Sequence, residues 1–191
     1  MNEIEIVRNI NHFGAGGIVD IITSFISDQV FLIVLWSILI TLAFIIDKKN
    51  GKLLLVAVTI GLALHFLISE GFFKYLLPDT FGIFRLRPWI AYQDIATIGN
   101  LTYDSSFPSS HMSVIMMMLT VFISFYRKYW IWALLFLLVM GFARIHNGMH
   151  FPSDVIGGII LGFLYGALAM YLAKKLVKHQ YHDLDARAFK T

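Results

Sequence analysis

Five long apolar runs leave this chain few choices of fold. They cover residues 30–46, 53–69, 111–126, 130–142 and 154–173. A helix that crosses a bilayer needs about 20 mostly apolar residues, and its backbone must satisfy its own hydrogen bonds. The runs therefore predict an all-α bundle integral to a membrane, with about five transmembrane helices.

Composition supports the same class of protein. The chain is 58% hydrophobic and 14% charged, whereas about 25% charged residues is usual for a soluble domain. We expect one membrane domain over residues 1–191. The net charge of +3 is gathered in short segments between the runs, which is typical of topology signals and not of a nucleic-acid-binding face. No nucleic-acid partner is expected.

A shorter segment near the N-terminus has a different pattern. Apolar residues recur at helical spacing across residues 18–26, with Asp20, Thr23 and Ser24 between them. This pattern predicts an amphipathic helix that lies in the membrane interface. The alternative is a sixth, weaker span, so the bundle has five or six spans. The first eleven residues lack the charged-then-apolar order of a cleaved signal peptide.

Basic residues between the runs predict the orientation. With five spans, three basic clusters fall on one side, which the positive-inside rule makes cytoplasmic. The opposite side then receives the connection 70–108 and the loop 144–153. We therefore expect a protein of the plasma membrane whose polar motifs face the extracytoplasmic side. The clusters are Lys48, Lys49 and Lys52, then Arg127 and Lys128, then Lys174, Lys175 and Lys178.

The first polar motif is Phe107-Pro108-Ser109-Ser110-His111, directly before the third run. Serine before an apolar run is an N-cap signal, and the free N–H groups of a helix N-terminus favour phosphate. A histidine in that first turn could reach a bound group. The alternative is an ordinary cap beside an interfacial histidine.

The second polar motif extends from Arg144 to Asp154 and contains His150. Asp154 opens the fifth run and could accept a hydrogen bond from one imidazole nitrogen of His150. That contact would leave the other nitrogen free as a base or nucleophile. The alternative is a helix cap beside a surface histidine.

Two arginines complete the candidate site. Arg87 and Arg144 carry planar cationic groups suited to phosphate oxygens, and Arg85 is a third candidate. A lone interfacial arginine usually extends toward the lipid headgroups, but several arginines beside paired histidines favour a phosphate site. Phosphoryl transfer needs mainly positioning and positive charge, which these groups could supply without a metal or another cofactor.

Two other features of the sequence are expected to have structural roles. His65 lies within the second run and is expected to be a buried, hydrogen-bonded histidine. The fifth run has small residues four apart, which allow close helix packing within the chain or between protomers of a homo-oligomer. They are Gly158, Gly162 and Gly166, next to Gly157.

The motifs resemble those of the type 2 phosphatidic acid phosphatase superfamily of membrane lipid phosphatases. Arg87-Pro88 is similar to the end of its first motif. Residues 108–111 are similar to its Pro-Ser-Gly-His, with Ser110 in place of glycine. Arg144, His150 and Asp154 match the spacing of its third motif, with Ala143 in place of serine. The resemblance covers residues 74–166.

One element of the family pattern is displaced. The family has a lysine seven residues before the arginine, where this chain has Thr80, and Lys74 lies thirteen residues before Arg87. Either Lys74 serves through a longer connection, or Arg85 replaces it, or the lysine role is absent. We favour Lys74.

The resemblance implies a two-step mechanism. His150 would attack phosphorus and form a phosphohistidine, with Asp154 orienting it. His111 would protonate the leaving oxygen and then activate water. The phosphate would be held by Arg87, Arg144, Lys74 and N–H groups near Ser109 and Ser110. The implied substrate is a lipid phosphate or diphosphate, with a polyprenyl diphosphate favoured over phosphatidate or phosphatidylglycerophosphate.

Two other functions remain open from the residues alone. A metal-dependent membrane hydrolase could use His146, His150 and Asp154, spaced four and four, with His111 as a further ligand. A small transporter could line a pathway with its arginines and histidines. However, the ionisable residues gather at one end of the predicted bundle.

Overall fold

The computed structural model describes residues 2–188, and the side chains among them except at Lys49 and residues 178–188. Every regular element in this part of the chain is helical. The elements are α1 (Glu3–Asn11), α2 (Ile18–Ile26), α3 (Gln29–Ile46), α4 (Lys48–His65), the π-helix η1 (Phe66–Leu76), α5 (Leu77–Phe81), α6 (Pro88–Ala91), α7 (Ser110–Phe125), the 3-10 helix η2 (Arg127–Tyr129), α8 (Trp130–His146) and α9 (Pro152–Ala188).

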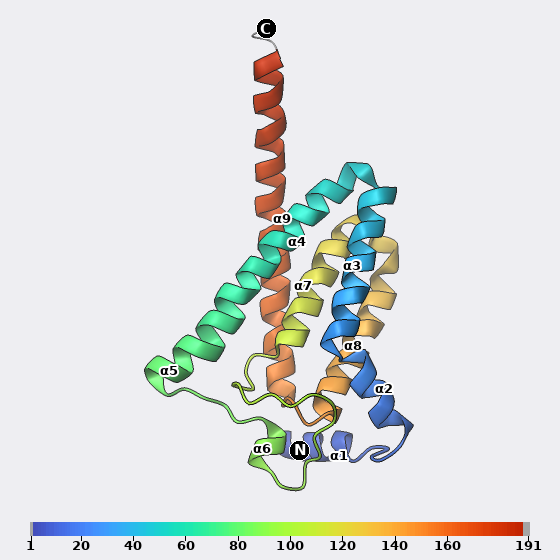
Figure 1. Ribbon diagram of the computed structural model, residues 1–191, viewed down its shortest axis with the longest axis vertical. Helices are drawn as coiled ribbons and strands as arrows, with labels where there is room; N and C mark the ends of the chain where they lie inside the picture. The colour runs from blue at the N-terminus through green and yellow to red at the C-terminus, as the bar shows by residue number, and fades with distance from the viewer. Residues whose placement is uncertain (1, 189–191) are drawn as a thin grey trace.

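The membrane bundle predicted from the apolar runs is confirmed. Four helical stretches of the described chain are long and apolar enough to cross a membrane: Gln29–Ile46, Asn50–Phe81, Arg127–His146 and Pro152–Val177. The third run forms α7, which is apolar but has only 16 residues. Helix α7 packs against α4, α8 and most extensively α9, and Figure 1 shows it within the bundle. The protein is an integral membrane protein.

The amphipathic N-terminal helix is also present. Helix α2 has nine residues, which rise about 14 Å and cannot cross a hydrocarbon core of about 30 Å. Its apolar side chains Ile18, Ile21 and Phe25 are exposed, whereas Thr23 is buried. Helix α2 therefore turns its polar side toward the protein, and the alternative of a sixth span is wrong.

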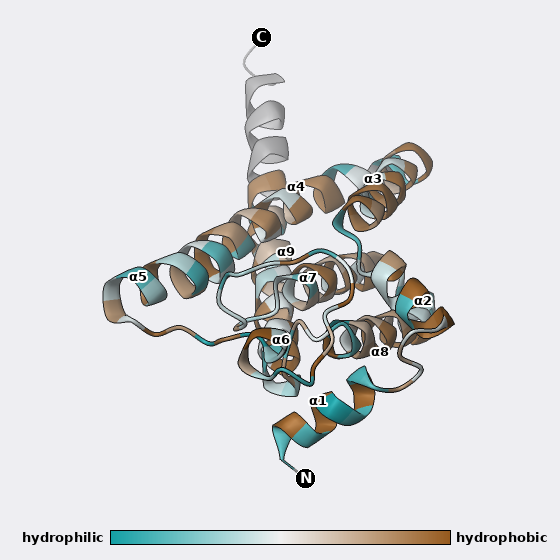
Figure 2. Cartoon of the chain, turned by 60° about the horizontal axis from the view of Figure 1, so that its bottom comes forward, coloured by the Kyte–Doolittle hydropathy of each residue, from teal (hydrophilic) through white to brown (hydrophobic). Residues whose placement is uncertain are grey.

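Helix α1 was not predicted from the sequence. Val7 and Ile4 are buried on its inner face, and α1 lies across the same end of the bundle as α6 (Figures 1 and 2). The buried Asn11 amide donates hydrogen bonds to the carbonyls of Ala96 at 2.8 Å and His146 at 2.6 Å. This short helix therefore closes the end of the bundle at which α8 ends.

The glycines of the fifth run are used within the chain. Gly158, Gly162 and Gly166 lie along α9 where it meets α7, and side chains there would collide with α7 or with Ser109 directly before it, whereas a side chain at Gly157 would collide with Phe107. A Cβ atom at Gly162 would lie 2.2 Å from the carbonyl oxygen of Ser113, and one at Gly158 would lie 2.6 Å from that of Ser109. The stripe thus sets the close approach that positions the first turn of α7 beside the first turn of α9.

Replacing Gly162 with alanine is expected to lower the free energy of unfolding by about 1–3 kcal/mol, because the new methyl group would overpack a backbone contact. Gly141→Ala is the matched control, since a Cβ atom there meets only ordinary contacts, the nearest at 3.4 Å. Thermal unfolding of both purified variants in one detergent would measure the difference. Equal midpoints for the two variants would contradict the packing assigned to Gly162.

The second membrane helix changes its winding before it reaches the site. Helix α4 continues into η1, a π-helix of 11 residues, and the stretch leans away from α3 in Figure 1. Positions five apart lie on different faces of an α-helix, whereas i→i+5 hydrogen bonding brings them close to one face. Ser69 and Lys74 are five apart and both buried. The π-helix therefore turns Lys74 toward the bundle.

Candidate active site

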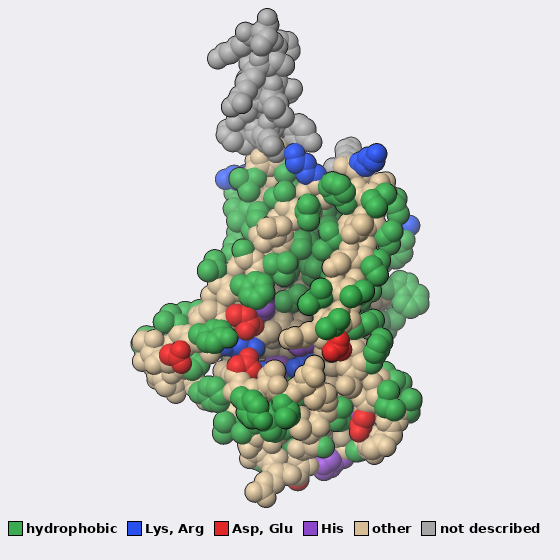
Figure 3. All heavy atoms as spheres, in the orientation of Figure 1, with side chains coloured by type: hydrophobic (Ala, Val, Ile, Leu, Met, Phe, Trp, Pro, Cys, Tyr) green, Lys and Arg blue, Asp and Glu red, His purple; other side chains and the backbone are tan. Residues whose placement is uncertain are grey.

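The predicted site residues meet at one end of the bundle. They come from η1, the start of α6, the start of α7, the end of α8, the following loop and the first turn of α9. Figure 3 shows acidic, basic and histidine side chains gathered in a hollow on this face, while further Lys and Arg side chains lie at the far end. This end therefore concentrates the ionisable groups, as the motifs predicted.

His150 presents one ring nitrogen to the site. Its Nδ1 lies 2.9 Å from the carbonyl oxygen of Ser106, and since a carbonyl only accepts, Nδ1 carries the hydrogen. Nε2 then holds the lone pair, and it lies 3.3 Å from Nη1 of Arg87. Burial, followed by the charges of Arg144, Arg87 and Lys74, holds the pKa of His150 well below 6.5. A neutral ring with an available Nε2 is the form that a nucleophile requires.

Asp154 is buried and fully hydrogen-bonded, but it does not contact His150 at hydrogen-bond distance. Its Oδ2 lies 3.8 Å from Nδ1 of His150. The same oxygen accepts from the Ser106 hydroxyl at 2.6 Å and from the Phe151 N–H at 2.8 Å. Asp154 is therefore linked to His150 through Ser106, whereas the sequence predicted a direct contact.

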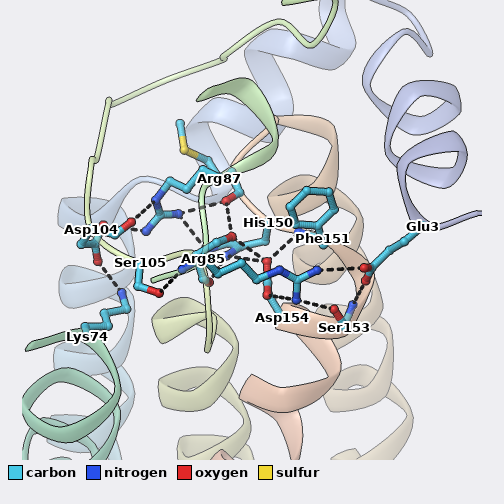
Figure 4. A network of polar contacts seen from close by, with 12 residues as sticks. Glu3, Lys74, Arg85, Arg87, Asp104, Ser105, His150, Phe151, Ser153 and Asp154 are labelled. Carbon is cyan, nitrogen blue, oxygen red and sulfur yellow. Dashed lines mark hydrogen bonds and ion pairs between the residues drawn. The ribbon is translucent and has the colours of Figure 1, made fainter. Parts of the chain in front are cut away.

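Arg85, the other candidate for the displaced lysine, contacts this carboxylate. Its Nη1 donates to Oδ1 of Asp154 at 2.7 Å, and its Nη2 donates to Glu3 at 2.8 Å (Figure 4). Asp154 thus forms an ion pair with Arg85 in addition to its hydrogen bonds from Ser106 and Phe151. Helix α1, which supplies Glu3, contributes to the site through this pair.

Lys74 joins the site with Arg87. Its Nζ lies 2.7 Å from Oδ2 of Asp104, and Nη2 of Arg87 lies 2.7 Å from Oδ1 of the same carboxylate (Figure 4). Burial raises the pKa of Asp104, but the charges of Lys74 and Arg87 outweigh it and lower the pKa to about 2. Of the three possibilities left open by the sequence, this placement favours Lys74 acting through a longer connection.

Arg144 and Ser109 have unused hydrogen-bonding capacity. Nε of Arg144 and the hydroxyl of Ser109 are buried, and neither has a hydrogen-bond partner among the described residues. Burying a cation or hydroxyl without a partner is costly, so a ligand that binds both groups would remove that cost. The positive charge of Arg144 interacts electrostatically with both His150 and His111. Its unused Nε donor therefore lies near the two motif histidines.

His111 is oriented from the other side. Its Nε2 lies 3.0 Å from the carbonyl oxygen of Ser27 at the end of α2, so Nε2 carries the hydrogen and Nδ1 is left for proton transfer. The neighbouring Ser110 donates its hydroxyl to Glu70. Ser110 thus bonds to η1, and its predicted contribution to phosphate binding falls to its backbone N–H.

His146 and His65 are held by contacts with other parts of the protein. The two ring nitrogens of His146 contact the Ile10 carbonyl at 2.7 Å and Asp20 at 2.9 Å. His146 is therefore not available to ligate a metal together with His150. His65 is buried and contacts the Ser113 hydroxyl at 2.9 Å, as predicted for a structural histidine.

Besides Glu3, sequence reasoning missed three contributors to the site. Asp104 and Ser106 lie in the connection between α6 and α7, where an acidic or hydroxyl residue is an ordinary surface choice. Glu70 lies in the π-helix, 3.6 Å from Lys74 and 3.5 Å from His65. The clue to Ser106 and Asp104 was their closeness in sequence to the Pro108–His111 motif.

Two solved structures share this architecture. Aquifex aeolicus LpxE superposes with a TM-score of 0.64 at 23% identity, over 87% of this chain and 93% of that one. A transmembrane PAP2-type phosphatidylglycerolphosphate phosphatase from Bacillus subtilis superposes with a TM-score of 0.54 at 24% identity, over 90% and 77%. At these identities the likeness supports the fold.

Curated sequences match over shorter stretches. "Bacitracin transport permease protein BcrC" of Bacillus licheniformis is 35% identical over 92 residues, which is 44% of this chain and 45% of that protein. "Putative undecaprenyl-diphosphatase YbjG" of Escherichia coli is 32% identical over 42% and 40%, and "Undecaprenyl-diphosphatase BcrC" of Bacillus subtilis is 32% identical over 50% and 48%. The matches span about half the length of these relatives.

A family match covers more of the sequence. The sequence profile of the PAP2 superfamily matches residues 54–178, which is well over half of the chain and includes every motif residue described above. The resemblance drawn from the motifs is confirmed: this chain belongs to the PAP2 superfamily.

Proposed function

We propose that this protein is a membrane phosphatase that removes the terminal phosphate from a lipid phosphate or diphosphate. The proposal rests on one observation above others. A buried Arg144 Nε and a buried Ser109 hydroxyl have no partner in the described chain, and they belong to the motifs that hold His111 and His150. A phosphate is the ligand that would satisfy a guanidinium, a hydroxyl and a helix N-terminus together.

In the first step, Nε2 of His150 attacks phosphorus, and the bond from phosphorus to the leaving oxygen breaks. Arg87 must release Nε2, which lies 3.3 Å from its Nη1, and its guanidinium then binds the phosphate. For this step His111 must carry a second proton on Nδ1 in addition to the hydrogen on Nε2, and it donates that Nδ1 proton to the leaving oxygen, which leaves the ring neutral. The products are the dephosphorylated lipid and a phosphohistidine at residue 150.

In the second step, water attacks the phosphorus of the phosphohistidine, and Nδ1 of His111 accepts a proton from that water. The bond from phosphorus to Nε2 breaks, and inorganic phosphate leaves. Asp154 stabilises the charged ring of His150 through Ser106, and Arg85 holds that carboxylate in place. Arg144, Arg87, Lys74 and the first-turn N–H groups of α7 spread the charge of the equatorial oxygens.

Among lipid phosphates we favour a polyprenyl diphosphate as the substrate. Two relatives are named undecaprenyl-diphosphatases, one of them putatively, and three cationic side chains at the site suit the higher charge of a diphosphate. Phosphatidate and phosphatidylglycerophosphate are the competing substrates. The tail would remain beside the apolar helices while the phosphate enters the end of the bundle.

Purified protein is expected to release inorganic phosphate from a polyprenyl diphosphate faster than from phosphatidate or phosphatidylglycerophosphate. Release should persist in excess chelator, because the described residues supply the positive charge themselves. A phosphate assay across these lipids in mixed micelles, with and without chelator, measures both points. Loss of activity on chelation with recovery on adding a divalent metal would instead favour a metal-dependent hydrolase.

We also propose that the site faces outward from the plasma membrane. The basic residues Lys48, Arg127 and Lys174 lie at the opposite end of the spans, and the positive-inside rule assigns that end to the cytoplasm. The chain has no cysteine, so single cysteines report cleanly. A membrane-impermeant thiol reagent is expected to label Asn100→Cys in intact cells and Lys128→Cys only after permeabilisation. The reverse pattern would overturn this topology.

A further inference from the structure

Asp104 lies where an anion bound to the site would be expected. Its two carboxylate oxygens contact the two cations separately, Oδ2 to Nζ of Lys74 and Oδ1 to Nη2 of Arg87, each at 2.7 Å. Its backbone carbonyl also accepts from Nε of Arg87 at 3.2 Å. One residue thus supplies acceptors to both cations, as a phosphate group would.

The donors of Arg87 are nearly all in use as a result. Asp104 takes Nε and one hydrogen of Nη2, while Nη1 faces the Met149 carbonyl at 3.0 Å and Nε2 of His150 at 3.3 Å. A guanidinium has five N–H donors, so a single one remains for a ligand. Release of His150 frees a second donor on Nη1, but the Nε–Nη2 edge of Arg87, together with Nζ of Lys74, becomes available to a phosphate only if Asp104 gives up its contacts.

The exposed fractions of Lys74, Arg87 and Asp104 show that Asp104 lies on the solvent side of the two cations. The side chains of Lys74 and Arg87 are 5% and 3% exposed, whereas that of Asp104 is 32% exposed. Asp104 also lies between α6 and α7, outside any helix. Its side chain therefore covers the cations from the solvent side and can move away without unfolding a helix.

We propose that Asp104 competes with phosphate groups for Lys74 and Arg87, and so determines how tightly the site binds its ligands. The proposal deepens the phosphatase function and rests on it for the identity of the ligand. An incoming phosphate displaces the carboxylate, and the carboxylate returns as inorganic phosphate leaves.

Competition of this kind has a definite consequence for affinity. When the binding-competent arrangement is only a fraction of the population, every ligand that needs it loses affinity by that same fraction. The phosphodiester headgroups of ordinary membrane lipids are weak but abundant anions at the same surface. A closed pair between Asp104 and its cations would keep these headgroups and product phosphate from occupying the site.

The test measures binding without turnover. Inorganic phosphate is titrated into purified full-length protein in a neutral detergent, followed by calorimetry, for the natural sequence and for Asp104→Asn. The variant is expected to bind phosphate about tenfold more tightly. This is the gain expected if Asp104 is released from Lys74 and Arg87 in about a tenth of the natural protein molecules. Dimethyl phosphate, a singly charged phosphodiester, should gain the same factor. Asp94→Asn is the matched control, because Asp94 lies in the same connection and pairs with the exposed Arg8.

Other results would overturn the proposal. Unchanged or weaker phosphate binding by Asp104→Asn would show that Asp104 only positions its cations. A gain for phosphate without an equal gain for dimethyl phosphate would show an effect of charge without displacement. Asp104→Ser provides the same test if the asparagine variant does not fold. Because none of these titrations needs hydrolysis, failure to hydrolyse any lipid phosphate would refute the phosphatase function separately.

Discussion

Replacing His150 with alanine is expected to lower phosphate release by at least about 10⁴-fold. Loss of a nucleophile in a covalent mechanism removes the whole two-step route, and residual activity then comes from binding alone. His150 is the motif histidine whose Nε2 is unprotonated and lies beside Arg87. The rate is measured with the best lipid substrate, and thermal unfolding verifies that the variant is folded.

His12→Ala is the control for this prediction. His12 is exposed and contacts the Asp94 carbonyl at 2.9 Å, away from the contacts of the motif residues. Its replacement should leave turnover within about twofold of the natural protein, as is typical of surface changes that touch no catalytic group. Turnover retained by His150→Ala would refute the assignment of the nucleophile.

The second large effect is expected at Arg144. Arg144→Met should reduce phosphate release by about 10²–10³-fold, the usual result of removing one preorganised donor to transition-state charge. The same variant should unfold at the same or a higher temperature, because Nε of Arg144 has no partner in the described chain and burying a cationic donor without a hydrogen-bond partner is costly. Activity and stability therefore move in opposite directions.

Arg87→Met provides the contrast. Arg87 also belongs to the phosphate site, but its guanidinium makes hydrogen bonds to Met149, Asp104 and His150. Its loss should lower both turnover and the midpoint of thermal unfolding, since buried partners are left unsatisfied. A fall in stability for Arg144→Met as large as that for Arg87→Met would show that Arg144 serves structure and not an incoming ligand.

The helices were the most predictable part of the molecule. The five runs correspond to observed helices because a membrane span demands a long apolar stretch whatever its tertiary contacts. The ends were less certain: the fourth run, placed at residues 130–142, continues to His146. Helix α1 was missed because its inner face is short and its residues are mostly polar, so its order depends on tertiary contacts such as those of Asn11.

The displaced lysine shows where sequence reasoning reached its limit. Spacing alone could not decide between Lys74 and Arg85, because the answer depends on the winding of the second span. A π-helix has no distinctive residue pattern, yet here it places Lys74 beside Asp104 and Arg87. Likewise, Asp154 was recognised as an acceptor, but its partners Ser106 and Arg85 depend on how the connection from α6 to α7 returns to α9.

The most direct test of the account is to trap the phosphorylated protein. An aryl phosphate labelled with ³²P, whose leaving oxygen needs no proton, is mixed with His111→Ala and quenched in alkali. The first step should proceed while activation of water is slow, so about one label per chain should appear as alkali-stable, acid-labile phosphohistidine on the peptide that contains His150. The label should be absent from the variant that also carries His150→Ala. Phosphate release in a single turnover without labelled protein, or label on another residue, would contradict attack by His150.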